Sequence, residues 1–413
     1  MRQSVPDIHI IGGGISGLIA ATVLEQHGFL PTIIEASDRL GGRVKTDIID
    51  GYSLDRGFQV LLTAYPAAKK YLDFDALSLQ EFLPGAAIFK NGKQKIIGDP
   101  SRKPSLLIPT LFSGIGTVKD KFKILALNQR LKKKTIQEIF SEKEQTTRLY
   151  LKDLEFSDAI ITDFFTPFFS GIFLENKLET SSRMFEFVYK MFGEGMAALP
   201  KHGIEAIPKQ LAKKLKNTTC IYNTKVKGVE SNSIKLESGE IIKSNFTIIT
   251  TQASELVSNL KNQATPWKYC DTLYFETPKR NIKKPLIGLI AKPRALINNI
   301  FYHSSIKTIA TAKKELLCVT VIENQNLTNK QLITAVEKEL KELCKIESCT
   351  FIKHYHIPMA LPNLENIQYE MLPSETRLTE SIFLAGDIQL NGSLNAAIIA
   401  GERAALEVIK RAS

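Results

Sequence analysis

Near the N-terminus, two short apolar runs enclose a segment of helical pattern. Residues 8–11 are mostly β-branched, which predicts a short buried strand, and residues 29–35 predict a second one. Between them, residues 15–27 predict a helix that ends at Gly28, with a set of apolar side chains facing the sheet: Leu18, Ala21, Val23 and Leu24. The pattern is a strand–turn–helix–strand unit of about 30 residues.

The middle and the end of the chain continue this alternation of strands and helices. Residues 220–251 alternate between apolar and polar positions around a turn at Ser238, which predicts a strand, a hairpin and another strand. Ile382–Ala385 predicts a further strand, and Ser393 is a suitable N-cap for the helix after it. Two other segments predict mainly helical structure: residues 113–135 and 163–192.

Three glycines lie in the turn between the first strand and the first helix. Gly12 permits the tight turn, Gly14 lets backbone N–H groups approach a pyrophosphate, and Gly17 lets the helix pack closely against the strand. The first N–H groups of the helix, at Ile15 and Ser16, would point toward the phosphate charge. The spacing in this context predicts a Rossmann-like dinucleotide site in an α/β fold.

Glu35 stands at the end of the second predicted strand, with Ala36 beside it. Its carboxylate can accept hydrogen bonds from the hydroxyl groups of a ribose. A negative charge at this position would repel a 2′-phosphate. The sequence of this unit therefore disfavours NADP and leaves FAD and NAD as the candidate cofactors.

The next ten residues distinguish these two cofactors. The stretch Arg39-x-Gly41-Gly42-Arg43-x-x-Thr46 resembles the second FAD motif of the flavoprotein group that contains amine oxidases, protoporphyrinogen oxidases and phytoene-type desaturases. Gly42 would let the backbone pass near the cofactor, and the Arg43 guanidinium would offer charged donors to the pyrophosphate. Arg39 either shares this role or is a surface arginine. The resemblance implies FAD.

Three later stretches extend the resemblance. Asp55 and the residues after Arg56 match a family element that brings backbone close to the flavin, and Val226 matches a valine that meets the adenine, although a plain strand valine would look the same. Asp387 would accept hydroxyl hydrogen bonds near the ribityl group. The resemblance implies contacts to FAD by these residues: Gly57, Phe58, Gln59, Val226, Gly386, Asp387, Ser393, Leu394 and Asn395.

The family motifs lie hundreds of residues apart, so the resemblance implies a discontinuous FAD-binding domain. We expect it to comprise residues 1–63, 198–251 and 379–413. The remaining segments, residues 64–197 and 252–378, would form an inserted α+β substrate domain that covers the flavin.

Two stretches of the inserted part have an unusual apolar content. Residues 163–192 hold eight phenylalanines, which we interpret mainly as core, with an apolar substrate tunnel as the alternative. Residues 103–116 are apolar, are flanked by lysines and contain Pro109. They predict either an ordinary buried loop or a segment that dips into a membrane surface, as in related desaturases.

Composition narrows the function classes. The net charge of +11 includes local lysine clusters, which we interpret as solvated helix faces. The alternative is affinity for anionic lipid or polyanions. No nucleic-acid-binding motif accompanies this charge, so nucleic acid is not an expected partner. The five cysteines show no paired or zinc-ligand spacing, and no secretory signal pattern is present, so we expect no metal and a cytoplasmic location, with peripheral contact to the inner face of a membrane left open.

The expected activity is the oxidation of a small molecule by hydride transfer from a C–H bond to flavin N5, with oxygen or a quinone as electron acceptor. Residues 355–364 resemble a stretch of protoporphyrinogen oxidases and related desaturases, which favours a bulky apolar substrate. The alternatives are an amine oxidase and a non-redox flavoprotein mutase or isomerase. The last sixty residues contain no cysteine, so the resemblance implies non-covalent FAD. No catalytic residue is assigned; His354 and His356 are the histidines worth testing.

Overall fold

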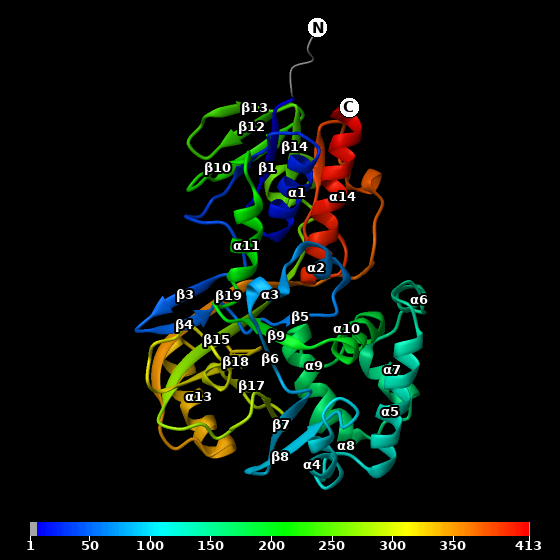
Figure 1. The fold of residues 1–413 in the computed structure, drawn as a ribbon, viewed down its shortest axis with the longest axis vertical. Coiled ribbons are helices and arrows are strands. Elements are labelled where there is room, and N and C mark those ends of the chain that lie inside the picture. Colours follow the sequence, from blue (N-terminus) through cyan, green and yellow to red (C-terminus); the bar gives the residue numbers. More distant parts are fainter. Residues whose placement is uncertain (1–5, 413) are drawn as a thin grey trace.

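The computed structural model describes residues 6–412. Two halves are stacked along the long axis (Figure 1), one built on a parallel sheet and the other on a mixed sheet with a group of helices. The expectation that no secretory signal is present concerns the first residues, and residues 1–5 lie outside the described part. Within residues 6–412, no helix combines the length and the hydropathy needed to cross a membrane.

A five-stranded parallel sheet with the order β10-β2-β1-β14-β20 forms the core of the first half. Its strands are β1 (Ile8–Ile11), β2 (Thr32–Ile34), β10 (Thr219–Ile221), β14 (Phe246–Ile249) and β20 (Ile382–Leu384). The apolar runs predicted as strands therefore lie in one sheet, in which β14 pairs with both β1 and β20. The prediction of an α/β, Rossmann-like fold is confirmed.

The second predicted strand is shorter than expected. The pattern predicted residues 29–35, whereas β2 begins at Thr32, directly after Pro31. Proline has no N–H group to donate to a neighbouring strand, and Pro31 only accepts, from the N–H group of Thr219. The hydrogen-bonded ladder of β2 therefore starts at Thr32, the residue after this proline.

Two helices from opposite ends of the sequence pack side by side against this sheet (Figure 1). They are α1 (Ile15–Gln26) and α14 (Leu394–Ala412). Helix α1 ends at Gln26, one residue before the predicted His27, and Gly28, with a φ of +83°, makes the turn that the sequence predicted. Small residues allow the close contact: a Cβ atom on Gly401 would lie 2.3 Å from the carbonyl oxygen of Ser16.

A small antiparallel sheet covers one face of the parallel sheet. Its strands are β11 (Val226–Glu230), β12 (Ser233–Leu236) and β13 (Ile241–Lys243). Apolar side chains of β11 and β12 form a buried cluster with Ile11, Ile34 and Ile249. The predicted hairpin is thus present between β10 and β14, with β13 as a third strand.

The second half contains a mixed seven-stranded sheet with the order β19-β15-β18-β17-β16-β7-β8. Its strands are β7 (Gly85–Lys90), β8 (Lys93–Gly98), β15 (Trp267–Thr277), β16 (Ile287–Ile290), β17 (Ile297–Tyr302), β18 (Glu315–Val321) and β19 (Thr350–Pro362). Helix α13 (Asn329–Cys344) packs on one face through Leu332, Val336 and Leu340. The inserted part is therefore α+β in content, as expected.

A group of helices lies beside the mixed sheet (Figure 1). It comprises α4 (Leu107–Leu111), α5 (Val118–Lys133), α6 (Ile136–Ser141), α7 (Thr147–Asp153), α8 (Asp158–Ile160), a π-helical turn (Ile161–Phe165), α9 (Thr166–Phe173) and α10 (Ser182–Glu194). Five of the eight phenylalanines predicted as core are at most 1% exposed: Phe165, Phe169, Phe173, Phe185 and Phe187. The core interpretation is confirmed for these five, whereas the other three are only half-buried.

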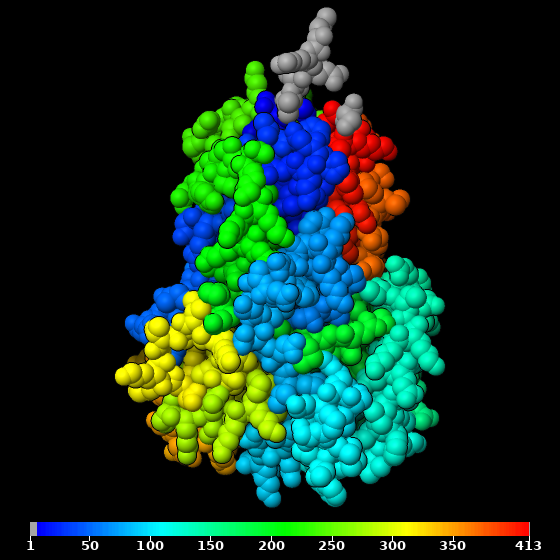
Figure 2. All heavy atoms as spheres, in the orientation of Figure 1, coloured from blue at the N-terminus to red at the C-terminus, as the bar shows by residue number. Residues whose placement is uncertain are grey.

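Short elements connect the two halves. They are β3 (Thr46–Ile49), β4 (Tyr52–Asp55), β5 (Leu61–Leu62), α2 (Pro66–Tyr71), α3 (Phe74–Leu77), β6 (Leu79–Glu81), β9 (Ala197–Pro200), α11 (Ala206–Lys214) and α12 (Ala253–Leu256). Helix α2 lies within the segment expected to belong to the substrate domain, yet it packs on α14. Figure 2 shows the blue, green and red parts of the chain together in one half, and the domain division stays a prediction.

Candidate functional site

The glycine turn after β1 leaves an open backbone cradle at the start of α1. Gly12 has a φ of +99°, and a Cβ atom there would lie 2.6 Å from the Cγ2 atom of Thr251. A Cβ atom on Gly17 would lie 2.1 Å from the Gly12 carbonyl oxygen, so the helix can approach the strand only because this residue is glycine. Gly14 is the N-cap of α1, and no side chain of the described residues caps the helix. The first N–H groups, at Ile15 and Ser16, therefore suit an anionic ligand.

A second glycine pair closes this cradle. Gly42 has a φ of +58°, and a Cβ atom on it would lie 3.1 Å from the Cα atom of Gly14. The two loops thus pass each other as bare backbone. The Ser16 hydroxyl donates to the carbonyl oxygen of Ala397 in α14, which ties the cradle to the C-terminal helix. This glycine-lined arrangement fits a pyrophosphate group.

Glu35 is fixed at the end of β2 by backbone donors. One carboxylate oxygen accepts from the Gly13 N–H group at 2.7 Å, and the other accepts from the Ser37 N–H and hydroxyl groups at 2.9 and 2.6 Å. The side chain is 8% exposed, whereas the neighbouring Ala36 is exposed. The oxygen that accepts from Gly13 keeps a second lone pair, so the group can also accept from a ribose hydroxyl.

Arg43 joins the N-terminal and C-terminal motifs. Its guanidinium forms an ion pair with the carboxylate of Asp387 and donates to the carbonyl oxygen of Ala360 at 3.2 Å. The Gln59 side-chain amide donates to the Arg43 carbonyl oxygen at 3.0 Å. Three predicted cofactor residues from distant parts of the sequence are therefore brought together here.

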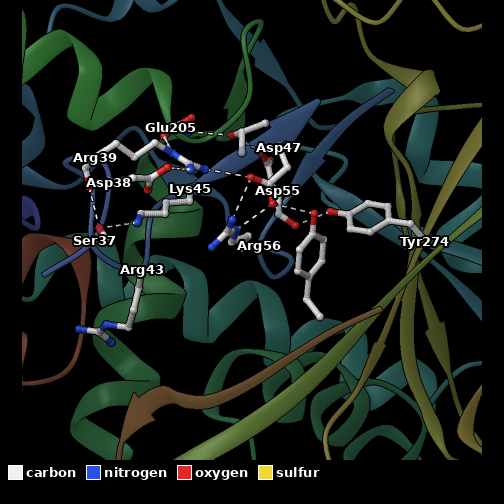
Figure 3. A network of polar contacts seen from close by, with 12 residues as sticks. Ser37, Asp38, Arg39, Arg43, Lys45, Asp47, Asp55, Arg56, Glu205 and Tyr274 are labelled. Atoms are coloured by element: carbon white, nitrogen blue, oxygen red, sulfur yellow. Dashed lines mark hydrogen bonds and ion pairs between the residues drawn. The ribbon is translucent and has the colours of Figure 1, made fainter. Parts of the chain in front are cut away.

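Arg39 has a different environment. Its guanidinium donates to Glu205 at 2.6 Å and to Asp47 at 2.9 Å, so it links the nucleotide loop to the turn before α11. In Figure 3, Arg39 points into this network while Arg43 lies apart from it. Burial raises the pKa of Asp47, but hydrogen bonds from Arg56, Tyr355 and Arg39 outweigh burial and lower the pKa to about 2.

The element after β4 lies against the mixed sheet. Gly57 has a φ of +96°, and a Cβ atom there would lie 2.9 Å from the Cδ1 atom of Ile357 in β19. The Phe58 ring packs against Phe301 and His303, with ring centroids 5.4 and 6.4 Å apart, and Phe301 stacks on Phe82. An aromatic cluster therefore adjoins the predicted flavin-contacting backbone.

The C-terminal motif is arranged by a strand end and a helix cap. Gly386 has a φ of +115° directly after β20, and Asp387 is 6% exposed. The Ser393 hydroxyl accepts from the Ala396 N–H group at 3.0 Å, so Ser393 is the N-cap that the sequence predicted. The Asn395 side-chain oxygen accepts from the N–H group of Ala67 in α2. Leu394 is half-buried beside it and packs against the main core.

Val226 lies near the nucleotide end of the cradle. It is 7% exposed and belongs to the apolar cluster with Ile11 and Ile34, at the carboxyl ends of β1 and β2. The backbone preceding it also approaches Glu35, since the Thr224 N–H group donates to the Glu35 carbonyl oxygen at 3.0 Å. These positions are compatible with a ligand that extends from Val226 to Arg43.

Trp267 and His303 lie beside the predicted site residues, although the sequence assigned neither of them to the site. The guanidinium of Arg43 lies 5.1 Å from the centroid of the Trp267 ring, and the Trp267 ring nitrogen is buried with no hydrogen-bond partner among the described residues. Burial lowers the pKa of His303 to about 4, so its ring is neutral at neutral pH beside Phe58. No local motif surrounds either residue; only the pairing of Trp267 with Pro362 in the mixed sheet brings the tryptophan to Arg43.

The two histidines chosen for testing share one carboxylate. His354 and His356 contact the same oxygen of Asp271 at 2.7 and 2.9 Å. Burial opposes ionisation of Asp271, but these two contacts outweigh it and lower its pKa. In the described chain, no group of three or more histidine, cysteine or acidic residues could hold a metal ion.

This chain is similar to a family of flavin-containing enzymes and, over shorter stretches, to individual oxidases. A family model described as "Flavin containing amine oxidoreductase" matches residues 15–409. Polyamine oxidase 5 of Oryza sativa subsp. japonica is 50% identical over 56 residues, which are 14% of this chain and 11% of that protein. Protoporphyrinogen oxidase 2 of Arabidopsis thaliana is 26% identical over 166 residues, or 40% of this chain and 32% of that protein. The matches thus span about a third or less of these relatives.

Solved structures match over nearly the whole chain. An oxidoreductase from Methanosarcina mazei has a TM-score of 0.73 and 15% identity, covering 98% of this chain and 100% of that one. Putrescine oxidase bound to putrescine has a TM-score of 0.70 and 15% identity, covering 98% of this chain and 99% of that one. At such identities, the likeness establishes the fold alone.

Proposed function

This chain belongs to the flavin-containing amine oxidoreductase family, and from that premise we propose that it oxidises a bulky apolar small molecule with non-covalent FAD. The substrate would lose a hydride from a C–H bond to N5 of the flavin, and oxygen or a quinone would accept the electrons. A flavin supplies this two-electron chemistry, whereas the protein binds, orients and excludes water.

The observation that carries the FAD assignment is the convergence of four polar features on one cradle. The uncapped start of α1 would donate to the pyrophosphate, together with the Arg43 guanidinium. Glu35 would accept from the ribose, and Asp387 would accept hydroxyl hydrogen bonds while holding Arg43 in place. Arg39 is better explained as a positioning residue, because carboxylates of Glu205 and Asp47 take its donors.

The aromatic cluster supports an apolar substrate. Phe58, Phe82 and Phe301 pack together beside Gly57, and the adjoining His303 is buried and uncharged. A polyamine is cationic and would be held by carboxylates, which these side chains do not supply. This environment would desolvate a substrate carbon near the flavin without offering a charged partner.

An amine substrate is the second candidate. Polyamine oxidases are among the matching relatives, and putrescine oxidase is among the matching structures. The polyamine oxidase match is 50% identical over 56 residues, whereas the protoporphyrinogen oxidase match is 26% identical over 166 residues.

Anaerobic bleaching of the flavin tests this proposal. The FAD-loaded protein is mixed without oxygen with porphyrinogens, carotenoid precursors or polyamines, and the flavin absorbance is followed. We expect bleaching by one apolar class and not by polyamines. Acid precipitation should leave the flavin in the supernatant, because no covalent link is expected. Bleaching by polyamines alone would establish the amine candidate, and a protein that takes up no FAD would contradict the whole assignment.

A further inference from the structure

The described surface has one concentrated apolar edge. Of the fifteen large apolar side chains exposed among the described residues, seven lie within residues 107–125. They are Leu107, Ile108, Leu111, Phe112, Val118, Phe122 and Leu125. Phe112 is 80% exposed, Ile108 is 69% exposed and Phe122 is 68% exposed. Single exposed apolar residues are ordinary, but a contiguous group marks an interaction site.

Helix α5 has a second apolar face that is exposed and does not pack in the core of the described chain. Leu127 and Leu131 are buried against the core. Val118, Phe122 and Leu125 follow the spacing i, i+4, i+7, and the helical period places them on the opposite side of the helix. Packing within the described chain therefore explains one face of α5 and leaves the other in solvent.

Helix α4 extends this apolar face. The Lys121 ammonium donates to the carbonyl oxygen of Leu111 at 2.8 Å, so the end of α4 lies beside the first turns of α5. The connection turns tightly through Gly114 and Gly116, with φ values of +69° and +63°. Figure 1 places α4 at the end of the molecule remote from α14. We call residues 107–125 the α4–α5 edge.

The α4–α5 edge lies in a strongly basic segment of the chain. Residues 101–134 contain nine lysines and arginines and one acidic residue, Asp120, which is buried. Lys119, Lys132 and Lys133 are exposed on the same helix. Acidic neighbours neutralise only part of this charge: Glu155 lies 4.0 Å from Lys119 and 3.0 Å from Lys123. Glu186 also pairs with Arg130 at 3.2 Å and with Lys134 at 2.5 Å.

We propose that the α4–α5 edge docks on the surface of a lipid bilayer that contains anionic headgroups. Phe112 and Phe122 would enter the boundary between headgroups and acyl chains, and the lysines would contact phosphate groups. A second copy of the chain is a poorer occupant, because pairing two such edges would bring like charges together. The proposal concerns a surface and does not depend on which substrate is oxidised.

Vesicle flotation of the full FAD-loaded chain tests this docking. The vesicles are phosphatidylcholine alone or phosphatidylcholine with a third of phosphatidylglycerol. We expect binding to the anionic vesicles, weakened by salt, with at least a tenfold loss in the partition coefficient for Ile108→Ser/Phe112→Ser/Phe122→Ser. Lys119→Gln/Lys132→Gln/Lys133→Gln should reduce binding by about fivefold per charge on anionic vesicles only.

The matched control changes exposed apolar residues elsewhere. Ile241→Ser/Leu372→Ser removes two side chains that are 64% and 65% exposed, and it should leave vesicle binding unchanged. Flavin absorbance and melting temperature show that each variant is folded. Equal binding by the wild type and the Ile108/Phe112/Phe122 variant, or no binding to anionic vesicles, would overturn the proposal. A shift from dimer to monomer in that variant would assign the edge to self-association instead.

Discussion

At the scale of single residues, Asp55 has the most perturbed carboxyl group in the connecting region. Its side-chain oxygen accepts from Thr46 at 2.6 Å and from the Ile204 N–H group at 3.0 Å, and the Tyr274 hydroxyl donates to its carbonyl oxygen at 2.8 Å (Figure 3). Burial raises its pKa to about 6, although the two hydrogen bonds to the carboxyl group oppose this shift. Asp55 therefore joins β4 to the turn before α11 and is not expected to meet the cofactor.

A raised carboxyl pKa has a defined effect on stability. The folded protein binds this proton more tightly than the unfolded chain, so the charge of Asp55 destabilises the fold increasingly from pH 4 to pH 6 and fully above pH 6. As the pH rises from 4 to 7, the unfolding free energy of Asp55→Asn should therefore increase relative to wild type by about 2 kcal/mol. Denaturant titrations at both values measure this difference.

Asp47 is a control, because its pKa is shifted in the opposite direction to that of Asp55. Its pKa is lowered to about 2, so its contribution to stability is present above pH 4 and is lost as the pH falls toward 2. Asp47→Asn should therefore lose stability at pH 7. A pH-independent difference between Asp55→Asn and wild type would show that the Asp55 pKa is not raised.

Residue roles were predictable only where a local motif carried them. The glycines flanking α1 and the Ser393 cap follow from local backbone needs, and Gly12 and Ser393 indeed have the geometry expected. The environments of Arg39 and Trp267 were not predictable, because Glu205, which pairs with Arg39, and Arg43, which lies over Trp267, are each more than 160 residues away in sequence. Such contacts depend on long-range folding, such as the pairing of β15 with β19 that places Trp267 beside Pro362.

At the scale of elements, the contact between α1 and α14 fixes the geometry of the cradle. Gly401 allows α14 to touch the backbone of Ser16, and the Ser16 hydroxyl bonds to Ala397 one turn earlier. The sequence predicted both helices from their apolar spacing. Their mutual packing was not predicted, because the side chains of one helix do not specify which distant helix they meet.

Gly401→Ala tests this contact. The added methyl group would lie 2.3 Å from the Ser16 carbonyl oxygen, so the helices must separate, at a cost of about 1–3 kcal/mol. We expect a lower melting temperature and weaker FAD retention. Gly193→Ala in α10 is the matched control, since a Cβ atom there meets nothing within 4 Å and alanine favours the helix by about 1 kcal/mol. Similar effects of both substitutions would contradict the packing argument.

At the scale of the whole molecule, the candidate site is assembled from both ends of the chain. Arg43 and Asp387 form an ion pair across 344 residues, and β1 pairs with β14, which in turn pairs with β20. The expected strands were found because each is a short apolar run. The family resemblance implied that these distant segments form one discontinuous domain, but their order in the sheet was not predicted.

Hydrogen exchange with and without FAD tests whether the distant segments act as one site. We expect FAD to slow exchange together at residues 12–17 and 386–396, because both would contact one ligand, and to leave α13 unchanged as an internal control. Glu35→Ala, which lacks the proposed ribose acceptor, should need a higher FAD concentration for the same protection. Protection confined to one of the two segments would show that the ligand does not bridge them.

The interleaved path of the chain also has a mechanical consequence. Under the proposed division, the backbone passes between the two halves four times, near residues 63, 197, 251 and 378. A single connection can serve as a hinge, whereas four parallel tethers at separate places resist rotation of one half against the other. Entry of a bulky molecule to the interior would then require rearrangement of local side chains or short loops, and wide opening of the two lobes would not be the route.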